Sequence, residues 1–298
     1  MKKLTLASLY FFVVIIANAQ KLPNVQTTSL RAPADIKIDG QATEWNNQYQ
    51  AYNKNIEVFY TIANDDDNLY VLIHASNSRS IEKIIEGGIS FTANNSGKKD
   101  DKKNVVILFP LLPLPIGKGT LVSAGKSLTG ATHSDDREDL TQSLNATAQA
   151  NRASSMAKAN KELLENLKEI KISGISAIID TIPGINPTTP YFRTLPLRNH
   201  SFKYITMINH DNIKAMTQFD EKRELTYELA IPIKYLNLPA GNTQKFHYNI
   251  TVNARGEDGR PGNTWSFNPP GTEPRMKDQD MEEPTDFSGE YTLAKNNN

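Results

Sequence analysis

Two short stretches decide the fold of this chain: Ile36-Lys37-Ile38-Asp39-Gly40, with Glu44-Trp45 close behind, and Asn64-Asp65-Asp66-Asp67-Asn68-Leu69-Tyr70-Val71. The first predicts a short strand, a turn and a tryptophan. The second predicts a hairpin, because the alternating run 56–62 enters the acidic turn and the nearly continuous apolar run 69–75 leaves it. Asn and Asp favour the turn, since their side chains bond to the nearby backbone and tolerate left-handed conformations.

Further strand patterns flank a helical middle. They lie at 89–92, 105–109, 213–219, 224–231, 246–254 and 291–294. In a β-sandwich, segments far apart in the sequence pair in the same sheet, and splitting the chain at the helix would leave open edges in both halves. We therefore predict a single all-β domain over residues 20–298, an antiparallel β-sandwich of jelly-roll or immunoglobulin-like type with an insertion at about 110–200.

The insertion begins with the proline-rich run 110–119, which cannot join a regular sheet. The stretch 136–171 is rich in Ala, Leu, Lys and Glu and predicts a helix. One stripe of this helix is apolar and holds Met156, Leu163, Leu167 and Ile170. Such a helix can pack across the β-core, cover a binding face as a lid or pair with a helix of a partner, and the stripe favours packing.

Residues 1–19 have the three parts of a secretory signal peptide. Lys2 and Lys3 supply the charge, the run 4–16 is apolar, and Ala17-Asn18-Ala19 is an A-x-A cleavage site. This run is short for a crossing of ~30 Å of hydrocarbon, and no later segment is long and apolar enough. We expect a mature protein without a transmembrane segment that starts near Gln20 and is secreted, periplasmic or displayed at the cell surface.

Composition and motifs exclude several classes of function. The chain has no cysteine, and its 33 basic and 33 acidic residues cancel, so no overall field attracts nucleic acid. Its five histidines form no close pair of metal ligands, and neither a G-x-S-x-G motif nor a glycine-rich phosphate loop is present. No catalytic residue is nominated, and the expected protein is not an enzyme.

Four motifs in order along the chain resemble the family 9 carbohydrate-binding-module-like domains, which are related to DOMON domains. The opening resembles their "IDGxxxEW" entry and "DDxNLYV" hairpin, and Tyr227-Glu228-Leu229-Ala230-Ile231-Pro232 resembles their "YExAIP" strand. Asn253-x-Arg255 with Trp265-Ser266 resembles the late "NxR…TWS" segment, and residues 286–293 resemble the closing strand. The resemblance covers about two-thirds of the mature chain and says nothing of residues 110–200.

Domains of this class stack the faces of sugar rings on aromatic side chains and bind the hydroxyls with polar ones. The resemblance implies Trp265 as the stacking ring and Arg255 and Asn253 as its polar partners. It also implies that Trp45 belongs to the core. Members of the class often use two tryptophans, and here Tyr191 and Phe192 are the aromatic residues that could replace the second.

The acidic turn 65–68 lacks the alternating ligands and the distant Glu of an EF-hand, so a solvated hairpin turn is favoured over a calcium site. A second acidic region leaves a structural calcium ion open, although its spacing does not define one. It comprises Asp258, Glu273, Asp278, Asp280, Glu282 and Glu283. No metal ligand is nominated and no other cofactor is expected.

Two functions follow as hypotheses. In the first, the protein is non-catalytic and recognises a glycan or polysaccharide through a shallow aromatic platform. In the second, the sandwich is a scaffold of the cell envelope, and the helical insertion docks a protein partner. A polysaccharide hydrolase is disfavoured, because a separate catalytic barrel typically takes ~250 residues.

Overall fold

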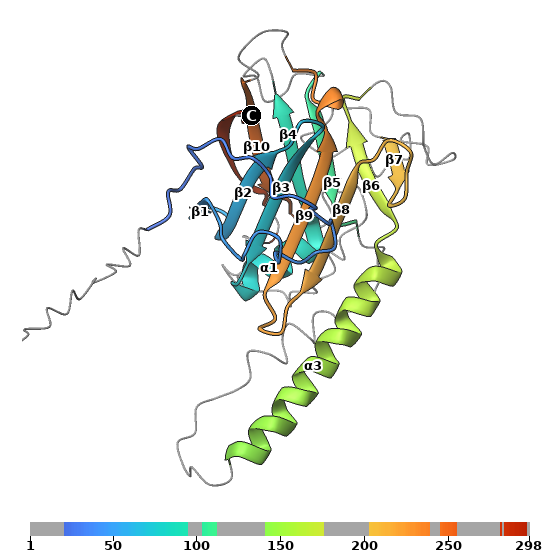
Figure 1. Ribbon diagram of the computed structural model, residues 1–298. Helices are drawn as coiled ribbons and strands as arrows, with labels where there is room; N and C mark the ends of the chain where they lie inside the picture. The colour runs from blue at the N-terminus through green and yellow to red at the C-terminus, as the bar shows by residue number, and fades with distance from the viewer. Residues whose placement is uncertain are drawn as a thin grey trace, which may run out of the picture.

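The computed structural model describes residues 21–94, 103–111, 141–175, 203–238, 245–254, 281 and 283–296; the side chains of 141–149, 151, 152 and 204 are not part of the description. Two sheets lie face to face, and the long helix α3 extends from one end of them (Figure 1). The expected signal peptide, Arg255, Trp265, Tyr191 and Phe192 lie outside the described residues, as does most of the second acidic region.

Sheet A holds the predicted hairpin. Its strand order is β1 (Ala51–Asn53), β2 (Val58–Asn64), β3 (Asn68–Ala75), β9 (Leu225–Pro232) and β8 (Lys214–Phe219), and every neighbouring pair is antiparallel. The acidic turn joins β2 to β3, as the sequence predicts. The sheet is therefore assembled from two parts of the chain about 140 residues apart, with β3 and β9 paired at its centre.

Sheet B has the order β11 (Thr285–Thr292), β10 (Lys245–Val252), β4 (Ile89–Asn94), β5 (Val105–Phe109), β6 (Glu169–Ser173) and β7 (Lys203–Thr206). Its neighbouring strands are also antiparallel. Helix α1 (Ser78–Gly87) leads from sheet A to sheet B, and Asn77 caps it by accepting a hydrogen bond from the Arg79 amide. A 3-10 turn, η2 (Ile233–Tyr235), follows β9.

The main core lies between the sheets, because alternate side chains of each strand point inward. Tyr60, Leu229, Phe91 and Ile107 are among the fully buried members. A polar contact joins the layers: the hydroxyls of Tyr60 on β2 and Tyr248 on β10 are 3.0 Å apart, and the Gln26 amide donates to Tyr60 at 2.8 Å. The predicted all-β sandwich with a helical insertion is confirmed.

Three local predictions were wrong. Residues 36–38 form no strand, because they lie across the outer face of sheet A rather than within it. The helix ends at Asn166, and Ile170 belongs to β6, an interior strand of sheet B. The run Glu169-Ile170-Lys171-Ile172-Ser173 has the two-residue period of a strand, which the helical spacing of Ile170 obscured. The last strand also starts earlier than predicted, at Thr285.

Helix α3 (Thr141–Asn166) packs on the sandwich through its C-terminal half. Met156, Ala159 and Leu163 are buried, as is Leu167 just beyond it. Asn160 holds the edge strand β8, since its amide group donates to the Phe219 carbonyl at 2.9 Å and accepts from the Phe219 amide at 2.8 Å. The packing interpretation of the apolar stripe is confirmed for this half. Within the described residues, no helix has the length and apolar character to cross a membrane.

Candidate functional site

The outer face of sheet A is mostly apolar and is partly covered by the chain itself. The segment that precedes β1, shown in dark blue in Figure 1, runs across the face. Its residues Ala42 and Trp45 pack on Tyr70, Leu72 and Ala230 of the sheet. Trp45 is only 6% exposed, and its ring meets that of Tyr70 edge-on at 6.5 Å. The expectation that Trp45 is a core residue is confirmed.

Glu228 on β9 fixes this covering segment. Its carboxylate accepts hydrogen bonds from the amides of Asp39 and Gly40 at 3.0 and 2.9 Å, and from Trp45 Nε1 at 3.2 Å. Burial raises the pKa of Glu228 to about 7, although the three donors oppose the shift. The motifs at residues 36–45 and 227–232, which are far apart in the sequence, thus contact each other in the fold.

The acidic turn of the hairpin is occupied by its own hydrogen bonds. Asp65 accepts from the Asp67 and Asn68 amides at 2.8 and 2.6 Å and from the Tyr70 hydroxyl at 2.6 Å. Partial burial raises the pKa of the Asp65 carboxyl, but the donors outweigh it and hold the pKa below its usual value. Asp66 pairs with Arg31 at 2.9 Å. Across the residues that the structure describes, no group of three potential ligands could hold a metal ion.

Beyond the covering segment, four rings form a cluster on the same face. We call Tyr49, Tyr52, Phe59 and His74 the aromatic row. The strand register places Tyr52 opposite Phe59, and Phe59 opposite His74, on β1, β2 and β3. Tyr52 and Phe59 have ring centroids 4.7 Å apart. Tyr49, at the end of the covering segment, stacks on His74 at 5.2 Å with 17° between the planes and meets Phe59 at 5.6 Å.

The aromatic row is partly open to solvent, and its two tyrosine hydroxyls are available for hydrogen bonds. Tyr49, Tyr52 and Phe59 are all of intermediate exposure, whereas His74 is 9% exposed. Neither tyrosine hydroxyl has a hydrogen-bond partner within the described part of the chain, in contrast to the bonded hydroxyls of Tyr60 and Tyr70. An aromatic surface with free hydroxyls at its edge can stack on an apolar ring face and bond polar groups beside it.

Carboxylates adjoin the row. Glu224, which precedes β9, contacts His74 Nε2 through Oε2 at 3.0 Å, and its side chain is 28% exposed. The Thr226 hydroxyl lies 3.4 Å from His74 Nδ1. Burial raises the pKa of Tyr49, and the nearby charges of Glu224, Asp220 and Glu228 raise it further.

Of the three site residues that the resemblance implies, the structure describes only Asn253. Its side chain is 4% exposed and bonds inside the protein: Nδ2 donates to the Gly88 carbonyl at 3.2 Å and lies 3.0 Å from Ser90 Oγ. These bonds tie the end of β10 to the start of β4. Arg255 and Trp265 lie outside the described residues.

Comparison of the chain with known protein families, curated proteins and solved structures finds no significant match. The function is therefore argued from the geometry of the site.

The aromatic row is not among the sites predicted from the sequence. Its rings come from three strands and a loop, and in the sequence each resembles an ordinary strand residue. One signal was present: Phe59 and Tyr52 fall on the positions that alternate with the buried residues Val58, Tyr60 and Asn53. Large aromatic rings on an outward-facing register position point to a surface that something else covers.

Proposed function

We propose that this chain is an exported, non-catalytic protein that recognises a glycan through an aromatic platform. The observation that carries the proposal is the aromatic row, in which Tyr52 and Phe59 present partly exposed rings on a sheet and Tyr49 flanks them. The resemblance of the motifs to carbohydrate-binding domains and the expected signal peptide support it. Trp265 and Arg255 remain a second proposed contact region.

The physical basis is complementarity between a sugar ring and an aromatic face. One face of a pyranose exposes C–H groups and is apolar, so it gains by stacking on a π-surface and leaving water. The hydroxyls around its rim need directional partners. Tyr49 and Tyr52 offer free hydroxyls for this purpose. A sheet supports the rings, which limits the conformational entropy lost on binding.

The test is a glycan array followed by calorimetry on the best ligand, with and without calcium. We expect Phe59→Ala and Tyr52→Ala each to weaken binding about tenfold or more, as for loss of an aromatic contact worth at least ~1.4 kcal/mol. Ile208→Ala is the control, because Ile208 is an apolar side chain 92% exposed in the β7–β8 loop. Absence of binding to every polysaccharide would contradict the proposal.

Trp265→Ala separates the two contact regions. If it alone abolishes binding while the row variants bind normally, the ligand sits at the segment after β10, and the row is structural. If only the row variants lose binding, the site is on sheet A. Each result requires an unchanged unfolding transition for the variant concerned.

The alternative is a cell-envelope interaction protein that docks a partner through α3. Its support is the course of α3, whose N-terminal half extends away from the sandwich (Figure 1). Deleting residues 141–150 tests it, because this leaves Asn160, the buried stripe and β6 in place. Loss of a co-purifying partner with glycan binding intact would favour the interaction protein.

A further inference from the structure

We infer that this chain forms a two-fold symmetric dimer in which strand β11 of one copy pairs antiparallel with β11 of a second copy. The dimer is independent of the proposed glycan binding, because it uses the edge of sheet B and not the outer face of sheet A. Three observations carry it: the length of β11 beside the other edge strands, the direction and exposure of its backbone groups, and a register in which the strand matches itself.

The edges of the two sheets differ in how they are protected. β1 is three residues long, and the segment before it bonds to this edge, where the Tyr52 amide donates to the Pro23 carbonyl at 2.9 Å. At the other edge of sheet A, Asn160 of α3 bonds both backbone groups of Phe219 on β8. On sheet B, β7 has four residues, whereas β11 has eight and borders the sheet beyond β10 (Figure 1). Short or covered edges resist the addition of a further strand, and a long open edge invites it.

The pairing of β10 shows which backbone groups of β11 point away from the sheet. The Asn253 amide donates to the Gly88 carbonyl at 3.0 Å, so the odd-numbered residues of β10 bond to β4. The even-numbered residues of β10 therefore bond to β11, where their partners are the odd-numbered residues from Thr285 to Tyr291. The even-numbered residues of β11, among them Ser288 and Glu290, direct their N–H and C=O groups to the free edge.

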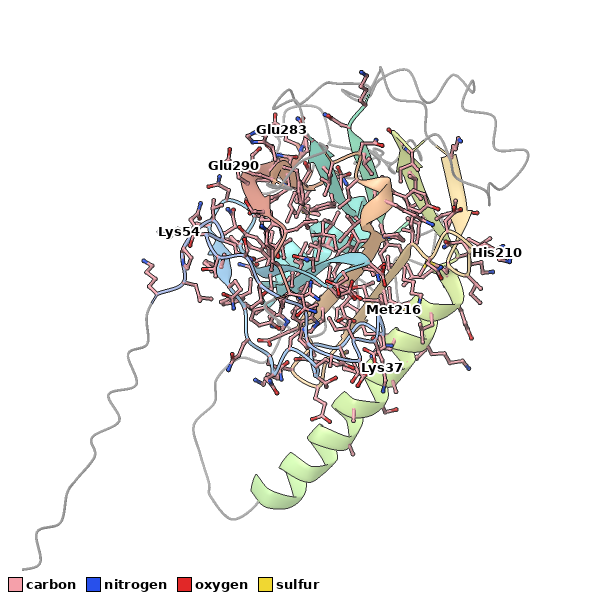
Figure 2. All side chains as sticks on the ribbon, turned by 45° about the horizontal axis from the view of Figure 1, so that its top comes forward. Lys37, Lys54, His210, Met216, Glu283 and Glu290 are labelled. Carbon is pink, nitrogen blue, oxygen red and sulfur yellow. The ribbon has the colours of Figure 1, made fainter. Side chains whose placement is uncertain are left out.

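This edge is accessible. Ser288 and Glu290 are exposed and Thr292 is partly exposed, and Figure 2 shows the Glu290 side chain at the margin of the molecule. Across the part of the chain that the structure describes, none of these three residues has a backbone partner on the free side of β11. A strand added here would gain a ladder of main-chain hydrogen bonds.

One antiparallel register matches β11 to itself. With the two-fold axis at Gly289, Ser288 of each copy lies opposite Glu290 of the other, and Asp286 lies opposite Thr292. The bonds between Ser288 and Glu290 then form twice, and no carboxylate lies directly opposite another. The registers two residues to either side place Asp286 opposite Glu290, or Glu290 opposite its own copy. Like charges directly opposite each other destabilise a sheet, so the register at Gly289 is favoured.

Sedimentation velocity of the purified protein over a hundredfold range of concentration tests the dimer. We expect the average mass to rise towards twice that of the monomer. Ser288→Pro removes an outward N–H from each copy and leaves the bonds to β10 in place, so it should raise the dissociation constant of the dimer about tenfold or more. Ser288→Ala is the matched control, because it keeps the N–H and removes only the hydroxyl that contacts Asn249. Circular dichroism should show both variants folded.

Cysteine cross-linking tests the register and does not depend on the proline variant, since the wild-type chain has no cysteine. Residues of a hydrogen-bonded pair have Cα atoms ~5.5 Å apart, within reach of a disulfide, whereas diagonal neighbours at ~7–8 Å are too far apart. We expect a mixture of Ser288→Cys and Glu290→Cys chains to cross-link under mild oxidation. Either variant alone should remain without a cross-link.

Three results would overturn the inference. A wild-type chain that stays monomeric at every concentration would exclude the dimer and leave the edge to a strand of another protein. A dimer that Ser288→Pro does not weaken would place the contact elsewhere on the molecule. Cross-linking of Ser288→Cys with itself would show a different register. None of these results bears on glycan binding, which the array tests separately.

Discussion

The outer faces of the two sheets differ in the character of their side chains and in what covers them. On sheet A the outward side chains are largely apolar, and the segment before β1 covers them. On sheet B, strands β10 and β11 carry polar side chains that satisfy one another. Asn249 Nδ2 donates to Asp286 at 2.6 Å and to Ser288 at 3.0 Å, and Lys245 pairs with Glu290 at 2.5 Å.

The difference shows on which of the two faces a ligand could form new favourable contacts. The polar pairs on β10 and β11 are exposed or partly exposed and already bonded, so a ligand there would replace contacts that water and neighbours supply. The aromatic row, in contrast, has partly exposed rings and two tyrosine hydroxyls that have no hydrogen-bond partner among the described residues. The covering segment stops at Tyr49, and the row begins where the cover ends.

The largest loss of stability is expected when the covering segment loses its buried tryptophan. Trp45→Ala deletes a buried ring and its bond to Glu228, and we expect it to lower the free energy of unfolding by about 3–5 kcal/mol, as large-to-small core changes do. Urea unfolding of the purified variant measures this. A change below ~1 kcal/mol would mean that the covering segment contributes little to sheet A.

The second largest loss of stability is expected for a substitution of Gln26, because its side chain bonds to the edge of β2 beyond the end of β1. Its amide donates to the Ile62 carbonyl at 2.8 Å and accepts from the Ile62 amide at 2.7 Å. Gln26→Ala would leave both backbone groups unpaired, at a cost of about 2–4 kcal/mol. Asn160→Ala is the comparison at the opposite edge of the sheet. An unfolding midpoint unchanged from wild type would show that water replaces the amide.

Glu228 makes the stability of sheet A depend on pH. Its folded pKa, about 7, lies above the ordinary glutamate value of 4.5. A raised folded pKa stabilises the fold fully below the unfolded pKa, and the contribution is lost as pH rises through about 7. We expect wild type to lose about 2–3 kcal/mol between pH 4.5 and 7.5 relative to Glu228→Gln. Parallel pH profiles of the two proteins would refute this.

The smallest change in stability is expected for a substitution on the outer face of sheet B. Lys245 holds the pKa of the Glu290 carboxyl below its usual value through a hydrogen bond and its charge, but the pair is exposed. Exposed pairs contribute little because water screens them. We expect Glu290→Gln to leave the urea midpoint unchanged within error at pH 7. A clear loss would show that the outer face of sheet B also depends on specific contacts.

Local signals predicted the elements whose contacts are close in the sequence. The hairpin around Asp65 was predictable because its turn residues bond to amides two and three positions away. Strand β9 was predictable from its alternation and from the proline that ends it. Strand β6 was missed, since a five-residue run carries too few periods to distinguish a strand from the end of a helix.

The aromatic row was missed for a different reason. Tyr52, Phe59 and His74 become neighbours only through the pairing of β1, β2 and β3, and Glu224 joins them only because β9 pairs with β3 across a gap of about 150 residues. Conversely, Asn253 looked available for a ligand in the sequence, and folding placed it against Gly88 and Ser90. Residue type carries chemistry, but exposure and partners depend on the sheet.

The sequence alone determined that the chain is a β-sandwich with a helical insertion, because strand periods and turn residues are local properties. Only the tertiary structure decided that residues 36–45 are a cover held by Glu228, and that the open part of the same face carries four rings, one of them bonded to Glu224. The reason is physical: the pairing register between distant strands fixes which side chains share a surface, and a single strand does not specify its register.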